Sequence, residues 1–204
     1  MAEENEWKVV NSKKKKKTTK NIIVDNETSV LNVSLNSNEI KDNGSGIHLP
    51  SKFIFWCHDI HSKDWSINGY SKLCSLENIS DFWKLFNNLN KLGYKINNFF
   101  LMKDDTDPTW EHINNRDGGI CSLRIEITEA INTYEDLCTR LMCNILTNNY
   151  SDINGISISP KNNWAIIKIW NKSTNNDLSK TLTIDILEKY KNGSIKYKAN
   201  EPEY

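Results

Sequence analysis

The chain has 204 residues, 38% of them hydrophobic and 25% charged, which is typical of one soluble globular domain with a single core. Its 26 Lys and Arg residues equal its 26 Asp and Glu residues, so the formal net charge is zero. Phosphate-driven affinity needs an excess of basic residues, so this balance argues against a charge-based grip on long nucleic acids over the whole surface. A nucleic-acid function would need a local site.

The cysteines and the hydropathy pattern indicate the compartment. The five cysteines are an odd number and include no CxxC pair. Nothing near the N-terminus has the form of a signal peptide, and the longest apolar runs, such as residues 53–57, are too short to cross a bilayer. We therefore expect a reduced, soluble, intracellular protein, located in the cytoplasm.

Residues 1–46 differ from the rest of the chain. They contain an unbroken basic run, Lys13 to Lys17, and then a polar stretch that ends at residues 42–46. Such a segment has too little apolar surface to offset the entropy lost on ordering, so we predict a disordered tail over 1–46 and one domain over 47–204. The lysine run fits a nuclear-localisation signal, a weak RNA contact or a solubilising tail.

The domain begins with two stretches rich in β-branched and aromatic residues, 52–59 and 70–76, which we expect to be strands. A helix follows, with Asn78 as its N-cap and Asp81 three residues later. Its apolar residues recur at helical spacing: Ile79, Phe82, Phe86 and Leu89. Residues 99–102 are the next expected strand.

The second half of the domain continues this alternation of strands and helices. A second helix is expected to begin at Thr133, whose hydroxyl can cap it, and a third covers 177–190. The apolar face of the second helix consists of Leu137, Leu141 and Ile145. The remaining strands are expected at 120–127, 154–159, 164–170 and 194–198. The several strands and the three helices, each with one apolar face, indicate an α+β domain whose helices cover one face of a sheet.

The sequence contains none of the common catalytic motifs. A glycine-rich phosphate loop, a nucleophile elbow, HExxH and the kinase signatures are all missing from it. Cys57, His58 and His61 come closest to a metal cluster, but they have no second ligand pair at zinc-type spacing. We expect a protein that is not an enzyme and that uses no metal or cofactor.

The most informative string is Asp-Pro-Thr-Trp-Glu at residues 107–111, which precedes a double glycine at 118–119. Taken alone, an indole beside a carboxylate in a polar loop is a weak signal. Single exposed aromatics are ordinary, so these residues alone favour the interpretation in which Trp110 caps the core and Glu111 lies in solvent.

From Ile47 to the C-terminus the chain resembles the eukaryotic translation initiation factor 4E family, the mRNA cap-binding subunit of the initiation machinery. The order and spacing of the family are kept at Leu49, Trp56, Trp65, 80–83, 108–111, 118–119, 150–155, 169–172 and 195–198. The resemblance implies a curved antiparallel sheet with three helices packed on its convex face and a cap pocket on its concave side.

The resemblance also implies the residues that read the base. Trp65 and Trp110 match two indoles that sandwich N7-methylated guanine, a ring whose positive charge favours cation–π stacking. Glu111 matches the carboxylate that accepts hydrogen bonds from guanine N1–H and the exocyclic amine. Trp170 matches the residue near the methyl group.

The phosphate-binding residues depart from the family pattern. Ile120 stands where an Arg usually follows the double glycine, and a third basic position falls on Ile166. Lys161 matches a second Arg but lacks its bidentate fork, and Lys168 lies on the same strand face as Trp170 and can substitute for the third. Trp164 matches no family position, and we assign it to core packing.

A second family surface binds scaffold and repressor proteins through a short helix with a Tyr and a Leu. The matching residues are Leu49, Ile79, Trp83 and Met142, although an amphipathic helix also needs such residues for its core. The implied partners are capped mRNA and either an initiation scaffold of the 4G type or a repressor, and we expect a monomer. The sequence leaves open an initiation factor, a cap-binding repressor or competitor that does not engage the scaffold, and a module that has lost cap binding.

Overall fold

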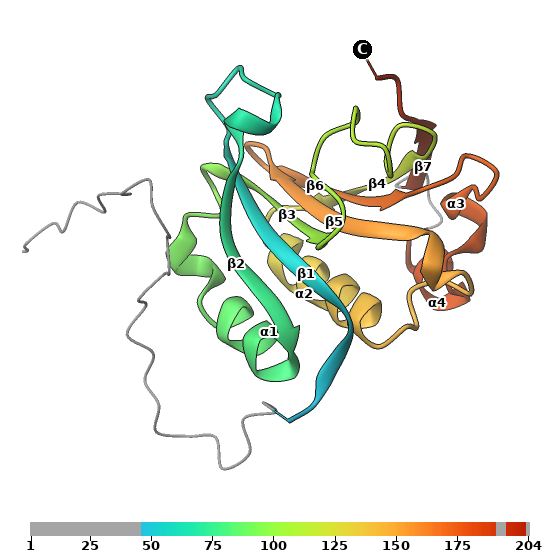
Figure 1. Cartoon of the computed structure of the whole chain (residues 1–204), viewed down its shortest axis with the longest axis horizontal. Coiled ribbons are helices and arrows are strands. Elements are labelled where there is room, and N and C mark those ends of the chain that lie inside the picture. The colour runs from blue at the N-terminus through green and yellow to red at the C-terminus, as the bar shows by residue number, and fades with distance from the viewer. Residues whose placement is uncertain (1–45, 191–194, 203–204) are drawn as a thin grey trace, which may run out of the picture.

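The structure is a computed structural model that describes residues 46–190 and 195–202 (Figure 1). The predicted tail lies outside the described residues, apart from its last residue. The strands are β1 (His48–Asp59), β2 (Ser71–Asn78), β3 (Asn97–Lys103), β4 (Gly119–Glu126), β5 (Ile153–Pro160), β6 (Trp164–Asn171) and β7 (Ile195–Ala199). The helices are α1 (Ile79–Phe86), α2 (Ala130–Met142), α3 (Leu178–Thr181) and α4 (Ile184–Lys189), with 3-10 turns η1 (Ile67–Gly69), η2 (Leu89–Leu92) and η3 (Tyr150–Asp152).

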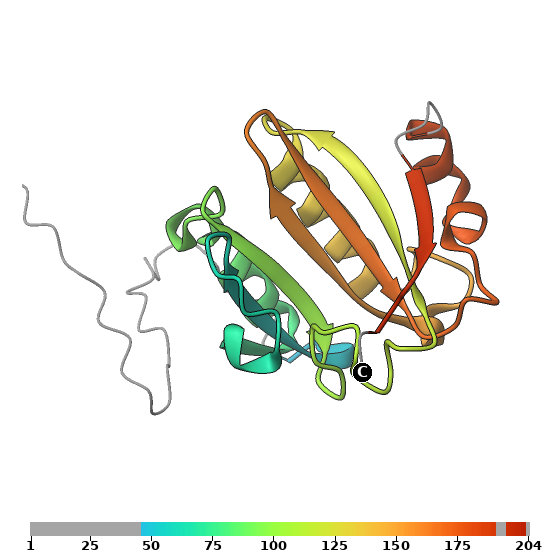
Figure 2. The ribbon, with the colours of Figure 1, turned by 90° about the horizontal axis from the view of Figure 1, so that it is seen from above.

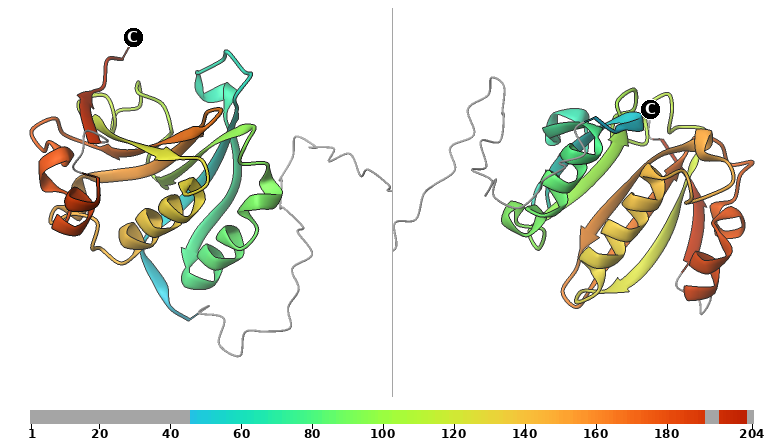
Figure 3. Two further views of the ribbon diagram at one scale, coloured as in Figure 1. Left: turned by 180° about the vertical axis from the view of Figure 1, so that it is seen from behind. Right: turned by 90° about the horizontal axis from the view of Figure 1, so that it is seen from below.

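The strands form one curved seven-stranded sheet in the order β2-β1-β3-β5-β6-β4-β7 (Figure 2). Each neighbouring pair is antiparallel. Helices α1 and α2 lie on the same side of this sheet (Figure 3), and residues of α3 and α4 join the same core cluster. We call this side the helix-covered face and the other side the open face. The predicted α+β fold is confirmed.

Side chains of each strand alternate between the two faces. Residues such as Phe53, Phe55, Leu101 and Ile167 are fully buried against the helices in the main core. A second, smaller cluster occupies the open face and consists of Ile54, Trp56, Phe100, Met102, Ile120 and Trp170. The members of this cluster are themselves buried, and the partly exposed Tyr70 and Trp110 pack against it, so these two rings lie where a ligand can approach.

The second helix differs from its prediction at both ends. It begins at Ala130, and Thr133 is a buried residue inside it whose N–H donates to the Glu129 carbonyl at 2.9 Å. Asn144 ends the segment in the left-handed region (φ 59°), so Ile145 turns outward and is 54% exposed while Leu146 is buried. The prediction that Thr133 is the N-cap is wrong, because the helix begins three residues earlier. The prediction that Ile145 packs in the core is also wrong, because the turn at Asn144 directs Ile145 outward.

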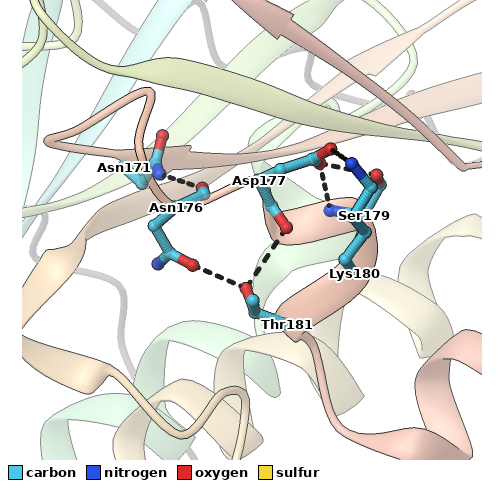
Figure 4. A network of polar contacts seen from close by, with 6 residues as sticks. All are labelled: Asn171, Asn176, Asp177, Ser179, Lys180 and Thr181. Carbon is cyan, nitrogen blue, oxygen red and sulfur yellow. Dashed lines mark hydrogen bonds and ion pairs between the residues drawn. The ribbon is translucent and has the colours of Figure 1, made fainter.

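The predicted third helix is two short helices. The backbone of Leu182 is extended (ψ 157°), and Leu182 forms a β-bridge with Thr147, so the helix is interrupted there. The Asp177 carboxylate caps α3 by accepting from the Ser179 N–H at 3.0 Å, and the Thr181 hydroxyl donates to Asn176 at 2.8 Å (Figure 4).

Within the described ranges, no helix is long and apolar enough to cross a membrane.

Candidate functional site

Trp65 lies in the connection between β1 and β2 and is 54% exposed. One face of its indole stacks on the His58 imidazole, with ring centroids 4.1 Å apart and an interplanar angle of 12°. His58 is itself buried and held in place, since its Nε2 lies 2.8 Å from the Asp64 carbonyl oxygen and its Nδ1 lies 3.4 Å from the Asn98 amide. The stacking on His58 therefore holds the Trp65 ring in place on one face, while much of the ring stays exposed to solvent.

Tyr70 connects Trp65 with the centre of the open face. Its ring makes an edge contact with Trp65 at 6.3 Å and with Phe100 at 5.2 Å, and a tilted contact with His58 at 4.8 Å. Burial raises the pKa of Tyr70, and the negative charge of Glu111 raises it further. Tyr70 was not predicted as a site residue, because a Tyr at the start of a strand carries no signal for the face of the sheet that it will occupy.

Trp110, Glu111 and Trp170 complete this end of the open face. Trp110 is partly buried and packs against the open-face cluster, and Glu111 is also partly buried. Trp170 is buried, meets Phe100 edge-on at 6.2 Å, and donates its Nε1–H to the Ser157 hydroxyl at 2.9 Å. The structure thus brings the four residues predicted to read guanine to one end of the open face.

Hydrogen bonds from buried side-chain amides hold the loop that carries Trp110 and Glu111. The Asn115 amide group donates to the carbonyls of Asp107 at 2.8 Å and Thr109 at 2.7 Å. Asn154 on β5 donates to the Asn115 side-chain oxygen at 2.8 Å, and Asn200 donates to the Asn115 carbonyl at 2.7 Å. The N–H donors of these buried amides hold one backbone conformation, because leaving such a donor unpaired costs free energy, whereas the buried side-chain oxygens of Asn154 and Asn200 have no hydrogen-bond partner among the described residues.

The double glycine is explained by close packing. A Cβ on Gly118 would lie 1.8 Å from the Asn171 carbonyl oxygen, and one on Gly119 would lie 2.4 Å from the Tyr197 hydroxyl. Asn171 follows Trp170 and binds the start of β4, accepting from the Gly119 N–H at 2.9 Å and from the Tyr197 hydroxyl at 3.0 Å. Its amide donates to the Asp152 carboxylate at 2.9 Å and, among others, to the Asn176 carbonyl that Figure 4 shows.

The two predicted phosphate-binding residues, Lys161 and Lys168, lie on the part of the open face formed by β6 and the turn before it. Lys161 is exposed in the β5–β6 turn, and Lys168 is partly buried on β6. Burial lowers the pKa of the Lys168 amine, and the charge of Lys161 lowers it further. Ile120, at the position of the missing Arg, is buried in the open-face cluster. The site therefore carries its positive charge on β6 and its preceding turn.

Trp164 does not pack in the core as predicted. It is partly exposed, and the Arg124 guanidinium carbon lies 3.5 Å from its ring centroid. Neither core cluster of the described residues includes it. The physical reason is its register, because alternation along β6 puts Trp164 on the open face with Trp170.

The predicted scaffold-binding residues lie on the other side of the molecule. Trp83 is 37% exposed on α1, and the start of β1 runs beside that helix, where the Ile79 N–H donates to the Ile47 carbonyl at 3.0 Å. Leu49 and Ile79 are partly buried. Met142 is buried in the main core, so little of its side chain is left for a partner.

The family model described as "Eukaryotic initiation factor 4E" matches residues 48–203. The chain belongs to the eukaryotic initiation factor 4E family. The "Eukaryotic translation initiation factor 4E" of Dictyostelium discoideum is 28% identical over 121 residues, which are 58% of this chain and 48% of that protein. The chain therefore spans about half the length of that relative in the region that matches.

Solved structures of this initiation factor family share the fold. A complex of C. elegans eIF4E-3 with the 4E-binding protein Mextli and a cap analog has a TM-score of 0.64 at 14% identity, covering 78% of this chain and 98% of that one. A complex of Ascaris suum eIF4E-3 with the m2,2,7G cap has a TM-score of 0.61 at 18% identity, covering 78% and 93%. At these identities the likeness establishes the architecture of the sheet and its helices.

Proposed function

We propose that this protein binds the 7-methylguanosine cap of mRNA in translation initiation. The observation that carries the proposal is the convergence of Trp65, Trp110, Glu111 and Trp170 at one end of the open face, although they come from separate parts of the chain. Membership of the initiation factor 4E family supports the same function. Relatives of the same fold were solved with a cap analog and with the m2,2,7G cap, which supports it further.

The base is read by stacking and by a carboxylate. The indoles of Trp65 and Trp110 enclose the cationic methylguanine, and each stacked face contributes about 1–3 kcal/mol by analogy with other base–aromatic stacks. Glu111 accepts hydrogen bonds from N1–H and the exocyclic amine, a donor pair that adenine does not present. The backbone N–H of Trp110 meets O6, and Trp170 shapes the wall near the methyl group.

The triphosphate follows the open face toward Lys161 and Lys168. Both amines act as point charges that approach phosphate oxygens without a fixed fork, so they contribute affinity with little geometric selectivity. The lowered pKa of Lys168 reflects burial and the repulsion of Lys161, and a bound phosphate relieves that repulsion.

The test is a titration that follows intrinsic tryptophan fluorescence. We expect 7-methyl-GTP to quench the emission at concentrations at least tenfold lower than GTP, because only the methylated ring is cationic. The variant Trp65→Ala is expected to lose most of this selectivity, and Trp7→Ala, in the N-terminal segment, is the matched control. Equal weak quenching by both nucleotides would defeat the proposal.

A second surface supports recruitment to a protein partner. Trp83 is an exposed aromatic anchor on α1, beside the start of β1, as grooves that bind a partner helix require. We propose that it binds a helix with a Tyr and a Leu, from an initiation scaffold of the 4G type or from a repressor. The C. elegans relative, solved with a 4E-binding protein, supports a partner of this kind.

The alternative is a cap-binding repressor or competitor that does not engage the scaffold. A pull-down with an immobilised scaffold helix peptide distinguishes the two. A recruiting factor is retained, Trp83→Ala is not, and Lys189→Ala on α4 is retained as the control. Failure of the unaltered protein to bind, with 7-methyl-GTP binding intact, favours the competitor.

A further inference from the structure

The guanidinium of Arg124 and the indole of Trp164 form a cation–π pair on the open face. This pair lies away from the end of that face where Trp65, Trp110, Glu111 and Trp170 converge, which we call the guanine end. Arg124 is exposed on β4, and its guanidinium carbon lies 3.5 Å from the centroid of the Trp164 ring. The two residues lie on neighbouring antiparallel strands, where Arg124 is opposite Ile166, two residues beyond Trp164. Among the described residues no ion pair involves Arg124, so its charge and its outer planar face are available to a ligand.

Strand alternation gathers further positive charge around this pair. Lys168 on β6 and Lys196 on β7 lie opposite the same β4 residue, Ser122, and so share its face. Lys198 is also on this face but forms an exposed ion pair with Glu201 at 3.1 Å. The residues that these strands contribute to the main core on the helix-covered face are apolar or aromatic: Cys121, Leu123, Ile125, Ala165, Ile167, Ile169, Ile195 and Tyr197.

The charge on this part of the open face is therefore unbalanced, although the whole chain is neutral. Arg124, Lys168 and Lys196 lie on strands β4, β6 and β7, with Lys161 in the adjoining turn. The opposing carboxylate on these strands is Glu126, at the end of β4 and opposite Trp164. Local positive charge next to aromatic surface is the combination that single-stranded nucleic acid requires.

We propose that Arg124, Trp164 and Lys196 bind the first nucleotides that follow the cap in an RNA strand. The inference rests on the proposed function, which places the guanine beside Trp170. At a rise of about 3.3 Å per residue, Trp164 lies about 20 Å from Trp170 along β6, with Lys168 between them. The RNA begins at the bound guanine, and its triphosphate lies beside Lys168. The first nucleotides after the cap therefore reach the Arg124–Trp164 pair.

The chemistry of the pair suits a base of any identity. Bases released from a helix stack on the plane of an Arg guanidinium as well as on aromatic rings. Trp164 already holds the guanidinium flat, so less side-chain entropy is lost when a base adds to the outer face of Arg124. Lys196 and Lys168 then neutralise the adjoining phosphates.

The test compares 7-methyl-GTP with a capped five-nucleotide RNA of mixed sequence, each bound to the full chain at two salt concentrations. We expect the RNA to bind about tenfold more tightly than 7-methyl-GTP, the gain of about one stacked base, and the gain to shrink as salt rises. Trp164→Ala and Arg124→Ala are expected to lose that gain and to keep the affinity for 7-methyl-GTP. Lys189→Ala, which removes an amine 5.4 Å from the Tyr190 ring on α4, is the matched control and keeps both.

The variant Arg124→Lys separates stacking from charge, because Lys keeps the charge and loses the plane. It is expected to retain less than half of the gain in free energy. Equal affinities for 7-methyl-GTP and the capped RNA would overturn this inference and leave cap binding standing. A gain that survives in both Trp164→Ala and Arg124→Ala, with circular dichroism showing folded protein, would also overturn it. Absence of 7-methyl-GTP binding would instead defeat the proposed function itself.

Discussion

The two halves of the open face differ in how their side chains are held. At the guanine end, Trp65 is braced by the buried His58 ring, and the loop of Trp110 and Glu111 is fixed by Asn115. In the basic half, Lys161 and Arg124 are exposed, and the contacts of Arg124 are made through one stacked ring. We infer that base selectivity comes from a preorganised arrangement, whereas phosphate affinity comes from positive charge that adapts to the ligand.

This contrast also explains which family positions are kept. Under the proposed function, a base is recognised only if the ring and the carboxylate sit at fixed positions, which agrees with the resemblance of Trp65, Trp110 and Glu111 to the family pattern. A phosphate can be neutralised from several directions by a long flexible side chain. Lys168 can therefore stand in for a basic residue at Ile166, and Ile120 can join the apolar cluster.

The largest effect is expected from the carboxylate. Glu111→Ala removes two charge-assisted hydrogen bonds, each contributing about 1.5–3 kcal/mol, so the affinity for 7-methyl-GTP should fall at least 100-fold. Isothermal titration calorimetry measures it, and Glu129→Ala is a control for the lost charge. A loss below fivefold would mean that Glu111 does not read the base.

A smaller loss is expected from the support beneath the loop. Asn115→Asp keeps the shape but removes the two N–H donors to Asp107 and Thr109, which should destabilise the fold by about 1–3 kcal/mol. We expect about a tenfold loss of cap affinity, measured by fluorescence titration, and chemical denaturation gives the stability. Asn175→Asp, on an exposed residue, is the control. Unchanged affinity despite lower stability would show that the loop orders itself on the ligand.

The basic half should show its effect only when phosphate is present. Lys168→Ala is expected to weaken 7-methyl-GTP three- to tenfold, or about 0.6–1.4 kcal/mol, as for the loss of one ordinary hydrogen bond, and to leave the binding of the 7-methylguanosine nucleoside unaffected. Competition between the two ligands in a single assay provides the comparison. Equal losses for both ligands would place Lys168 in the structure of the site and not in phosphate binding.

The smallest effect concerns pH. Burial and the charge of Lys161 lower the pKa of Lys168, so in the free protein Lys168 loses its proton at a lower pH than an ordinary lysine. Phosphate binding favours the protonated amine, so affinity for 7-methyl-GTP should decrease as pH rises through that lowered pKa. In Lys161→Gln the neighbouring charge is gone, the pKa of Lys168 rises, and the decrease should move to higher pH. A pH profile that does not move would remove Lys161 from this role.

Much of the fold was predictable from particular residues. Asn78 caps α1 through the Asp81 N–H at 3.0 Å, as its place before an apolar helical pattern predicts. The hairpin of β5 and β6 also lies where its alternating residues indicate. The split between α3 and α4 was not predictable, because the Leu182 bridge to Thr147 is a tertiary contact that outweighs helical spacing.

The sequence by itself determined the family, and it led to the proposed residues of the guanine end, because stacking and guanine recognition need particular side chains at matched positions. Only the tertiary structure decided which other residues join them. Tyr70, His58 and Trp164 carry no local signal, since their roles depend on which face of the sheet each reaches and what lies across the neighbouring strand. Pairing of strands far apart in the chain sets that arrangement, and no single stretch of sequence contains it.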